Sequence, residues 1–179
     1  RPVGRHITLT ATDSTFDMYS DSFRERAEVI AKAIGELCGD CERFLAVGLG
    51  NAALTSDAVG PLTAEKIFAT RHIKSLAKEL DTDNLGEVTV IQTGVLGSTG
   101  IESSEQVKAI AERVRPQAVI AVDALACSEL SNLGRTIQLC DTGISPGSGV
   151  ENARKELSLS TLGVKCIAIG VPTVIDLRT

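Results

Sequence analysis

One short stretch constrains the fold more than any other part of the chain. An apolar run, Phe44–Leu49 (FLAVGL), leads directly into a loop that begins at Gly50 and ends at Gly60. A continuous apolar run of this length is typical of a buried strand. Residues 61–68 follow and begin with a proline, which fits the first turn of a helix. The loop therefore joins a strand to a helix, and it carries Asp57 to the sheet edge where open α/β proteins bind ligands.

The remainder of the chain alternates between strand patterns and helix patterns. Short apolar or β-branched runs predict further strands at 7–10, 88–91, 118–122, 136–140 and 166–171. Apolar residues spaced three and four apart predict helices at 23–37, from about 58 to 80, at 103–114 and at 152–159. This alternation predicts a three-layer α/β fold, with a mostly parallel sheet and helices on both faces. The 179 residues are expected to form a single domain, residues 1–179.

Local signals predict where some of these elements begin and end. Ser22 and Ser103 each begin the pattern of a capping box before a helix. Gly39 is placed to end the first helix. Pro172 is placed to end the last strand, because proline has no N–H for the strand ladder.

The hydrophobic runs and the net charge of the chain disfavour membranes and nucleic acids as partners. No apolar run approaches the ~18 residues that a membrane-spanning helix needs, and no basic-then-apolar leader opens the chain. The net charge of −5 is unlike the basic surface of most nucleic-acid-binding proteins. An acidic enzyme can still attract a basic protein substrate.

The cysteine pattern indicates reduced, buried thiols. The chain has five cysteines, an odd number, and most of them lie beside apolar runs. Cys38 and Cys41 form a C-x-x-C, which leaves a redox pair as an alternative. This pair ends a predicted helix, and therefore lacks the helix N-terminus that lowers the pKa of a thiol.

Two acids each follow a very apolar predicted strand. Asp57 lies beyond the strand at 44–49, and Asp123 comes directly after the strand at 118–122. Because the carboxyl ends of parallel strands meet at one edge of a sheet, we expect these side chains to lie close together. Two neighbouring carboxyl groups do not both ionise readily, so one supplies a base that activates water and the other an acid. The alternative is that each acid only caps a helix or a turn.

Motifs of other enzyme classes are absent or incomplete. The loop reads G-x-G-x-x-A from Gly48, whereas dinucleotide-binding folds need G-x-G-x-x-G. Neither the phosphate-binding G-x-x-x-x-G-K-[ST] nor the nucleophile motif G-x-S-x-G occurs. The two histidines, His6 and His72, lie at no strand end, which disfavours a Ser–His or Cys–His mechanism. The D-T-G triplet at 141–143 occurs once in an α/β pattern, so we interpret it as a turn rather than as a pepsin-like site.

Long runs of the sequence resemble the germination protease (GPR endopeptidase) family of spore-forming bacteria. The resemblance extends in order over about residues 1–176, and the run at 141–150 is the most specific. The runs that carry it are GLGN…TSDAVGP (48–61), QTGV…TGIE (92–102), VDALA (122–126), TIQLCDTGISPGSGV (136–150) and AIGVPTV (168–174).

This resemblance implies an atypical aspartic endopeptidase that degrades small acid-soluble spore proteins during germination. It also implies a zymogen, a homotetramer, and action in the cytoplasm of the spore core. The two aspartates proposed to be catalytic in this family fall on Asp57 and Asp123. Asn51, or the backbone N–H groups of its loop, is our candidate for stabilising the oxyanion. Asp141 and Thr142 are second candidates for substrate binding, and we expect neither a metal nor another cofactor.

The expected fold is also similar to that of the hydrogenase maturation proteases, which act on a nickel-containing substrate. Their metal-facing acids would fall on Asp57 and Asp123, and their third ligand is a histidine further along the chain. No histidine follows His72 here, and two carboxylates without imidazole are a poor ligand set for nickel. A nickel-dependent maturation protease therefore remains an alternative, as does a non-catalytic domain that keeps the fold.

Germination proteases are considerably longer than this chain. We therefore expect the sequence to be a fragment, without an N-terminal segment before Arg1 and a C-terminal portion after Thr179.

Overall fold

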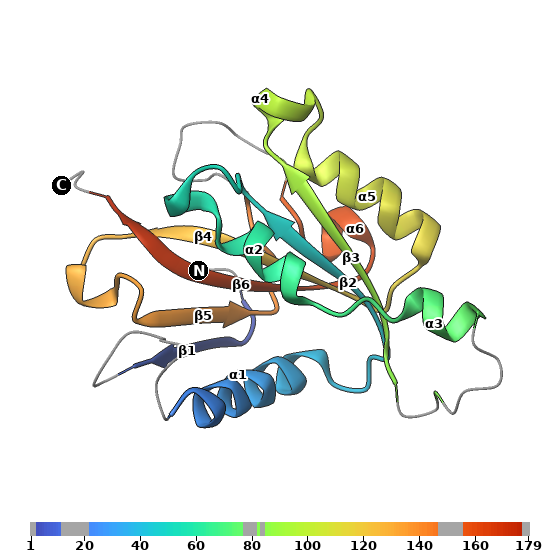
Figure 1. The fold of residues 1–179 in the computed structure, drawn as a ribbon, viewed down its shortest axis with the longest axis horizontal. Helices are drawn as coiled ribbons and strands as arrows, with labels where there is room; N and C mark the ends of the chain where they lie inside the picture. Colours follow the sequence, from blue (N-terminus) through green and yellow to red (C-terminus); the bar gives the residue numbers. More distant parts are fainter. Residues whose placement is uncertain (1–2, 12–21, 77–81, 83–84, 147–155, 177–179) are drawn as a thin grey trace.

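The strands form one sheet with a parallel centre. The computed structural model describes residues 3–11, 22–76, 82, 85–146 and 156–176, and its six strands are β1 (His6–Thr10), β2 (Arg43–Leu49), β3 (Glu87–Gly94), β4 (Ala118–Cys127), β5 (Thr136–Cys140) and β6 (Lys165–Ile175). They lie in the order β1-β5-β6-β4-β2-β3 (Figure 1). The pairs β2–β3, β2–β4 and β4–β6 are parallel, whereas β5–β6 and β1–β5 are antiparallel. The predicted mostly parallel sheet is confirmed.

Helices cover both faces of the sheet, which confirms the predicted three layers. They are α1 (Phe23–Cys38), α2 (Val59–Lys66), α3 (Arg71–Leu76), α4 (Leu96–Thr99), α5 (Ser103–Val114) and α6 (Leu159–Leu162), with short 3-10 turns η1 (Thr55–Asp57) and η2 (Leu130–Asn132). Helix α1 packs on one face and α5 on the other (Figure 1). Helix α2 lies on the same face as α1, because Ala64 faces Gly48 there.

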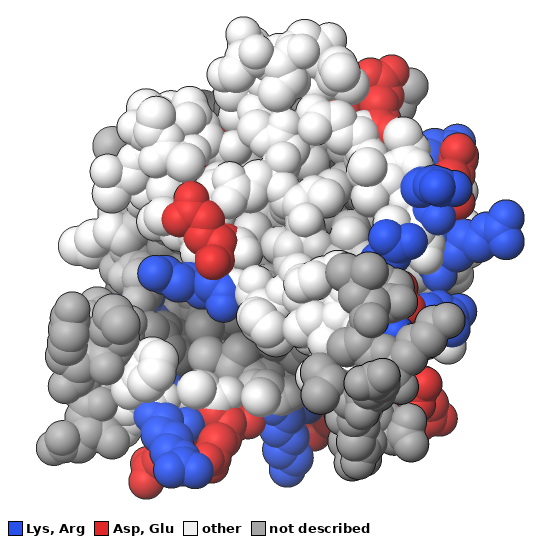
Figure 2. Space-filling view, turned by 45° about the vertical axis from the view of Figure 1, so that its right-hand side comes forward, with Lys and Arg blue, Asp and Glu red and all other residues white. Residues whose placement is uncertain are grey.

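Two features of the described residues bear on possible partners: the length of the helices and the distribution of charge on the face in Figure 2. Among the described helices, none has the length and apolar character needed to cross a membrane. In Figure 2, most Lys and Arg lie along the right and lower margins together with Asp and Glu, one further group of each sign lies left of centre, and the other described residues in view are uncharged.

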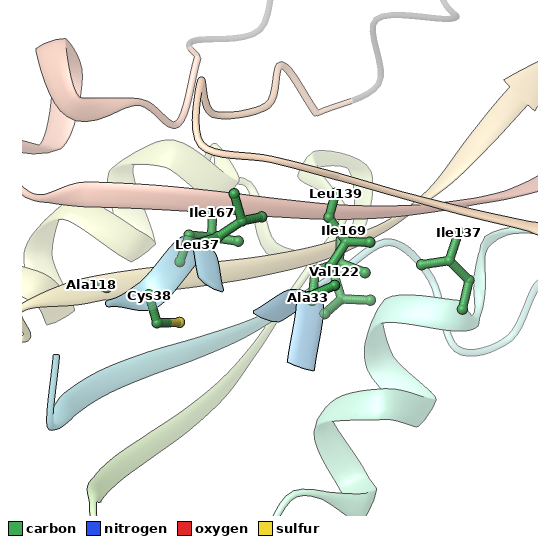
Figure 3. Packing of buried hydrophobic residues seen from close by; sticks show 9 residues of the cluster. All are labelled: Ala33, Leu37, Cys38, Ala118, Val122, Ile137, Leu139, Ile167 and Ile169. Atoms are coloured by element: carbon green, nitrogen blue, oxygen red, sulfur yellow. The ribbon is translucent and has the colours of Figure 1, made fainter. Parts of the chain in front are cut away.

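Successive residues of the central strands alternate between two cores. On β4, Ala118 and Val122 belong to the core under α1, whereas Val119 and Ala121 belong to the core under α5. This alternation follows from the period of two in a strand, and it explains why the central strands are apolar throughout. Figure 3 shows the core under α1, whose buried residues come from α1, β4, β5 and β6: Ala33, Leu37, Cys38, Ala118, Val122, Ile137, Leu139, Ile167 and Ile169.

The prediction of one helix from about 58 to 80 is wrong, because Thr70 joins the sheet. Helix α2 ends at Lys66 and α3 begins at Arg71, and residues 77–80 lie outside the described residues. Between the two helices, the Thr70 N–H donates to the Val88 carbonyl at 3.0 Å. The Thr70 hydroxyl donates to the Gly86 carbonyl at 2.5 Å and accepts from the Val88 N–H at 2.8 Å. These bonds attach the chain to the start of β3, which apolar periodicity does not reveal.

Proline does not end the last strand either. Strand β6 continues through Pro172 to Ile175 and stays paired with β4. The pairing with β5 stops at Gly170, so the missing N–H of Pro172 interrupts no β5 ladder. A register shift follows at Leu125 and Ala126 of β4, where such a bulge accommodates a proline.

Helix ends differ from the predicted caps in two places. Ser22 is the N-cap of α1, but its side chain makes no capping hydrogen bond. The N-cap of α5 is Glu102 rather than Ser103, and Glu102 forms a capping box with Glu105. A carboxylate accepts the free N–H groups there and also suits the positive end of the helix dipole. Gly39 ends α1 with a φ of 62°, as predicted.

The predicted helix at 152–159 falls largely outside the described residues. Residues 156–158 are not helical, and α6 begins only at Leu159. Leu157 instead pairs with Ile144 through two backbone hydrogen bonds of 2.8 and 2.9 Å. This pairing buries Leu157 completely in the core under α5.

We predict that Thr70→Val destabilises the protein by about 1–2 kcal/mol, because it leaves the partly buried Gly86 carbonyl and Val88 N–H without their hydroxyl partner. Thr70→Ser is the matched control, since it keeps the hydroxyl and loses only a methyl group. Equilibrium denaturation in urea gives both values. Equal losses in the two variants would show that the hydroxyl does not hold this connection.

Candidate active site

The loop that carries Asp57 is seated against the end of β2. Gly50 has a φ of 111°, a conformation that other residues rarely adopt. A Cβ at Gly50 would overlap the Asp57 carbonyl and would meet an Asp57 carboxyl oxygen at 2.9 Å. The Asn51 N–H donates to the Asp57 carbonyl at 3.0 Å, which closes the loop. The carboxyl group of Asp57 therefore lies beside the carboxyl end of β2, because Gly50 has no side chain.

The start of α2 holds this loop at two strands at once. A Cβ at Gly60 would overlap the carbonyl oxygens of Leu49 on β2 and Val122 on β4. Both are backbone atoms, which cannot turn aside as a flexible side chain can. Close backbone approach at Gly60 thus fixes the distance between the Asp57 loop and both strand ends.

Asp123 lies within a strand, not at its end as predicted. β4 continues to Cys127 because β6 still pairs with it after β2 has ended. Asp123 is paired with Gly170 of β6, its side chain is 7% exposed, and Oδ1 accepts the Ala124 N–H at 2.9 Å. The acid interrupts the apolar run, which made the strand look finished at residue 122, although the apolar residues 124–127 (ALAC) continue it beside β6.

The strand register brings the two acids to the same edge. Gly48 of β2 pairs with Val122 of β4, so Asp123 lies one position past that pair. Gly50, which touches Asp57, lies two positions past it on the adjacent strand. The turn η1, which ends at Asp57, contacts both β4 and β6. The catalytic role of the pair stays a prediction.

Thr173 is a supporting residue that the sequence did not single out. Its hydroxyl donates to the Ser56 carbonyl at 2.6 Å and thereby ties the Asp57 loop to β6. The residue sits in the extension of β6 beyond Pro172, where we predicted no strand.

The side-chain amide of Asn51 uses its oxygen within the loop and leaves its NH₂ without a partner among the described residues. Its side-chain oxygen accepts the Ala53 N–H at 3.0 Å, which forms a local turn. Within the described residues, its side-chain NH₂ has no hydrogen-bond partner. Asn51 therefore keeps a donor beside Asp57, which suits the predicted oxyanion role without testing it.

Asp141 and Thr142 have structural contacts at the other edge of the sheet. Asp141 accepts the Arg5 N–H at 2.8 Å and pairs with the Arg5 side chain at 3.3 Å. The Thr142 hydroxyl contacts the Cys140 sulfur at 3.3 Å. Burial tends to raise the pKa of Asp141, but hydrogen bonds and charge from Arg5 outweigh it and lower that pKa below 3.8. These contacts attach the segment before β1; a role in substrate binding stays a prediction.

All five cysteines are free thiols, but the predicted burial holds only for Cys38 and Cys166, whereas Cys41, Cys127 and Cys140 are partly exposed. Burial, with a smaller effect of Cys41, raises the pKa of Cys38 against an opposing effect of Lys165. Burial also raises the pKa of Cys166 to about 12, with smaller effects of Cys140 and Glu156. A raised pKa disfavours the thiolate that redox or nucleophilic chemistry needs. The C-x-x-C is therefore better explained as part of the packing at the end of α1.

The described residues show no ready metal centre. Within them, no three His, Cys, Asp or Glu side chains come together as metal ligands. His72 is exposed on α3, and His6 begins β1 at the far edge of the sheet, where we predicted no regular structure. Within the described residues, neither histidine therefore forms a metal-ligand group with Asp57 and Asp123.

Comparison with known proteins identifies the family of this chain. The model of the germination protease family matches residues 3–179. The chain belongs to the germination protease family. Germination proteases of Clostridium perfringens (strain SM101) and Clostridium tetani are 41% and 44% identical to it, over 100% of this chain and 55% and 56% of their own lengths. That of Oceanobacillus iheyensis is 44% identical, over 98% of this chain and 49% of its own length. The chain thus spans about half the length of these relatives.

A solved structure is more distant. The [NiFe] hydrogenase maturation protease HycI from Thermococcus kodakarensis KOD1 is 19% identical, with a TM-score of 0.47 over 78% of this chain and 80% of that chain. This likeness is too low to support a conclusion about metal or mechanism.

We predict that Asp141→Asn lowers the stability of this germination protease family member by about 0.5–1 kcal/mol at pH 7, because the ion pair with Arg5 is partly exposed. The folded-state pKa lies below the unfolded value of 3.8, so the wild type has this contribution above 3.8 and loses it as pH falls through the folded pKa. The difference between variant and wild type should therefore shrink in acid. Urea denaturation from pH 7 to pH 3 measures it, with the exposed Asp40→Asn as control. A difference that stays constant over this range would contradict the assigned ion pair.

Proposed function

We propose that this chain is the catalytic part of an endopeptidase that degrades small acid-soluble spore proteins during germination. Membership of the germination protease family supports the class of enzyme. The single observation that carries the proposed mechanism is the seating of Asp57 at Gly50, one strand away from the buried Asp123.

In this mechanism Asp57 and Asp123 act together on one water molecule. One carboxylate accepts a proton from the water while the oxygen of that water attacks the peptide carbonyl carbon. The other carboxyl group, in its protonated form, donates a proton to the leaving nitrogen.

The oxyanion that forms on the carbonyl oxygen needs hydrogen-bond donors. We assign this role to the side-chain NH₂ of Asn51. Its oxygen is already held by the Ala53 N–H, which orients the amide plane. An amide fixed on one side reorganises little when charge develops on the substrate.

The same proposal includes the finer properties that the family resemblance implies. These are synthesis as a zymogen, assembly into a homotetramer, and action in the cytoplasm of the spore core. The chain spans about half the length of the curated relatives it matches, so these properties are proposed for a full-length enzyme.

We predict that Asp57→Asn and Asp123→Asn, made in the full-length enzyme, each lower kcat/KM on a small acid-soluble spore protein by ~100-fold or more. Loss of a general acid or base typically costs this much. Asp40→Asn is the matched control, because Asp40 is exposed and precedes β2 at the opposite end of the strand. Cleavage is followed by gel electrophoresis and mass spectrometry.

Each enzyme is assayed with and without EDTA. Cleavage by the wild type that EDTA leaves unchanged supports a metal-free pair. Loss of wild-type cleavage in EDTA would instead make the two acids metal ligands. Full activity in both aspartate variants would refute the pair.

A further inference from the structure

A pocket lies on the sheet face opposite α1, over strands β1, β5 and β6. Its volume is about 230 Å³, and Ala168 and Gly170 are among the residues that line it. On β1 and β5 the alternate residues Ile7, Leu9, Ile137 and Leu139 pack toward α1. Thr8 and Gln138, which lie between them and line the pocket, therefore point to the opposite face.

The register places this pocket next to Asp123. Gly170 of β6 pairs with Asp123 on one side and with Gln138 on the other. Thr8 pairs with Gln138 and extends the same row to β1. Neighbouring strands are about 4.8 Å apart, and paired residues share a face. Asp123 and Gln138 thus stand on either side of a position that has no side chain.

Leu125 forms the wall between the pocket and the catalytic acid. It lies two residues after Asp123 on the same face of β4 and lines the pocket. A Cβ at Gly170 would overlap the side chain of Leu125. Leu125 therefore leans across Gly170, where it separates the pocket from Asp123 by a single side chain.

The lining suits one uncharged side chain with an apolar body. Leu125, Ile144 and Ala168 are apolar, His6 contributes an imidazole, and among the described residues no Asp, Glu, Lys or Arg lines the pocket. Gln138 and Thr8 are exposed, and within the described residues their side chains have no hydrogen-bond partner. The volume is below the roughly 300–1,000 Å³ of small-molecule sites, so it fits a side chain better than a cofactor.

We propose that this pocket binds the side chain of a substrate residue next to the scissile bond, and that Leu125 and Thr8 limit its size. Gln138 donates or accepts a hydrogen bond at the substrate backbone beside it. The proposal rests on the proposed peptidase function, since it takes Asp123 as the catalytic edge. It adds a specificity site that lies mostly on β1, β5 and β6, which carry neither Asp57 nor Asp123, and that β4 borders through Leu125.

Two matched variants test the pocket in the full-length enzyme. Thr8→Trp places an indole over the pocket, whereas Thr10→Trp places it on the same strand and face but outside the pocket. The probes are peptides that span a mapped cleavage site in a small acid-soluble spore protein. Each residue flanking the scissile bond is replaced in turn by Ala or Phe. The readout is the ratio of kcat/KM for Phe over Ala, which a general loss of stability does not change.

We predict that Thr8→Trp lowers this ratio at least ~10-fold at one flanking position, and that Leu125→Ala raises it at the same position, because the first narrows and the second widens the pocket. Thr10→Trp should leave the ratio within about twofold of wild type. An unchanged ratio in both Thr8→Trp and Leu125→Ala would overturn the proposal.

Binding of the same peptides separates this proposal from the catalytic one. Fluorescence anisotropy measures the affinity of each labelled peptide without any cleavage. If the wild type binds but cleaves none of the peptides, the peptidase function fails, and the Phe-over-Ala binding ratio of Thr8→Trp still decides on the pocket. Equal binding ratios in Thr8→Trp and Thr10→Trp would refute the pocket even in an active enzyme.

Discussion

Close backbone contact between the Asp57 loop and the ends of β2 and β4 is the constraint on which the candidate site depends. Gly60 lies against the carbonyl oxygens of both strands, and Gly50 lies against Asp57 itself. A side chain at either glycine would push the loop off the sheet edge, because the atoms that it would meet are backbone or the acid. The position of the Asp57 carboxyl group thus depends on the lack of a side chain at Gly50 and at Gly60. Overpacking of this kind typically costs about 1–3 kcal/mol, and here it would also move a functional group.

The sequence was sufficient for the plan of the fold and for part of the site. Apolar runs located the central strands correctly. These strands are buried on both faces, so nearly every one of their residues is apolar. Strand ends were less predictable, since Asp123 interrupts the apolar run of β4 and the pairing with β6 continues the strand to Cys127. The break at Thr70 was missed for a similar reason, because its partners are on β3. Thr173 and Gln138 carried no local signal. The role of Thr173 follows from its hydrogen bond to the Ser56 carbonyl, and the proposed role of Gln138 follows from the strand register.

At the antiparallel edge, one face of the sheet carries the core under α1 and the other carries the pocket proposed for substrate recognition. Toward α1, Ile137 and Leu139 of β5 complete a core. On the other face, the residues between them line the pocket beside Asp123. Asp141 attaches the segment before β1 through Arg5 and so closes this edge. The loop at 141–146 therefore supports the pocket wall, which gives a physical reason for a D-T-G turn in a protein without a pepsin-like body.

The central claim is that Asp57 and Asp123 act as one unit, and a double-mutant cycle tests it most directly. The measurement is kcat/KM of the full-length enzyme on a small acid-soluble spore protein, for Asp57→Asn, Asp123→Asn and the double variant. If both acids serve the same water molecule, removing the second costs little once the first is gone, and the double variant should be about as slow as either single one. Losses that multiply in the double variant would show independent roles and contradict the shared site.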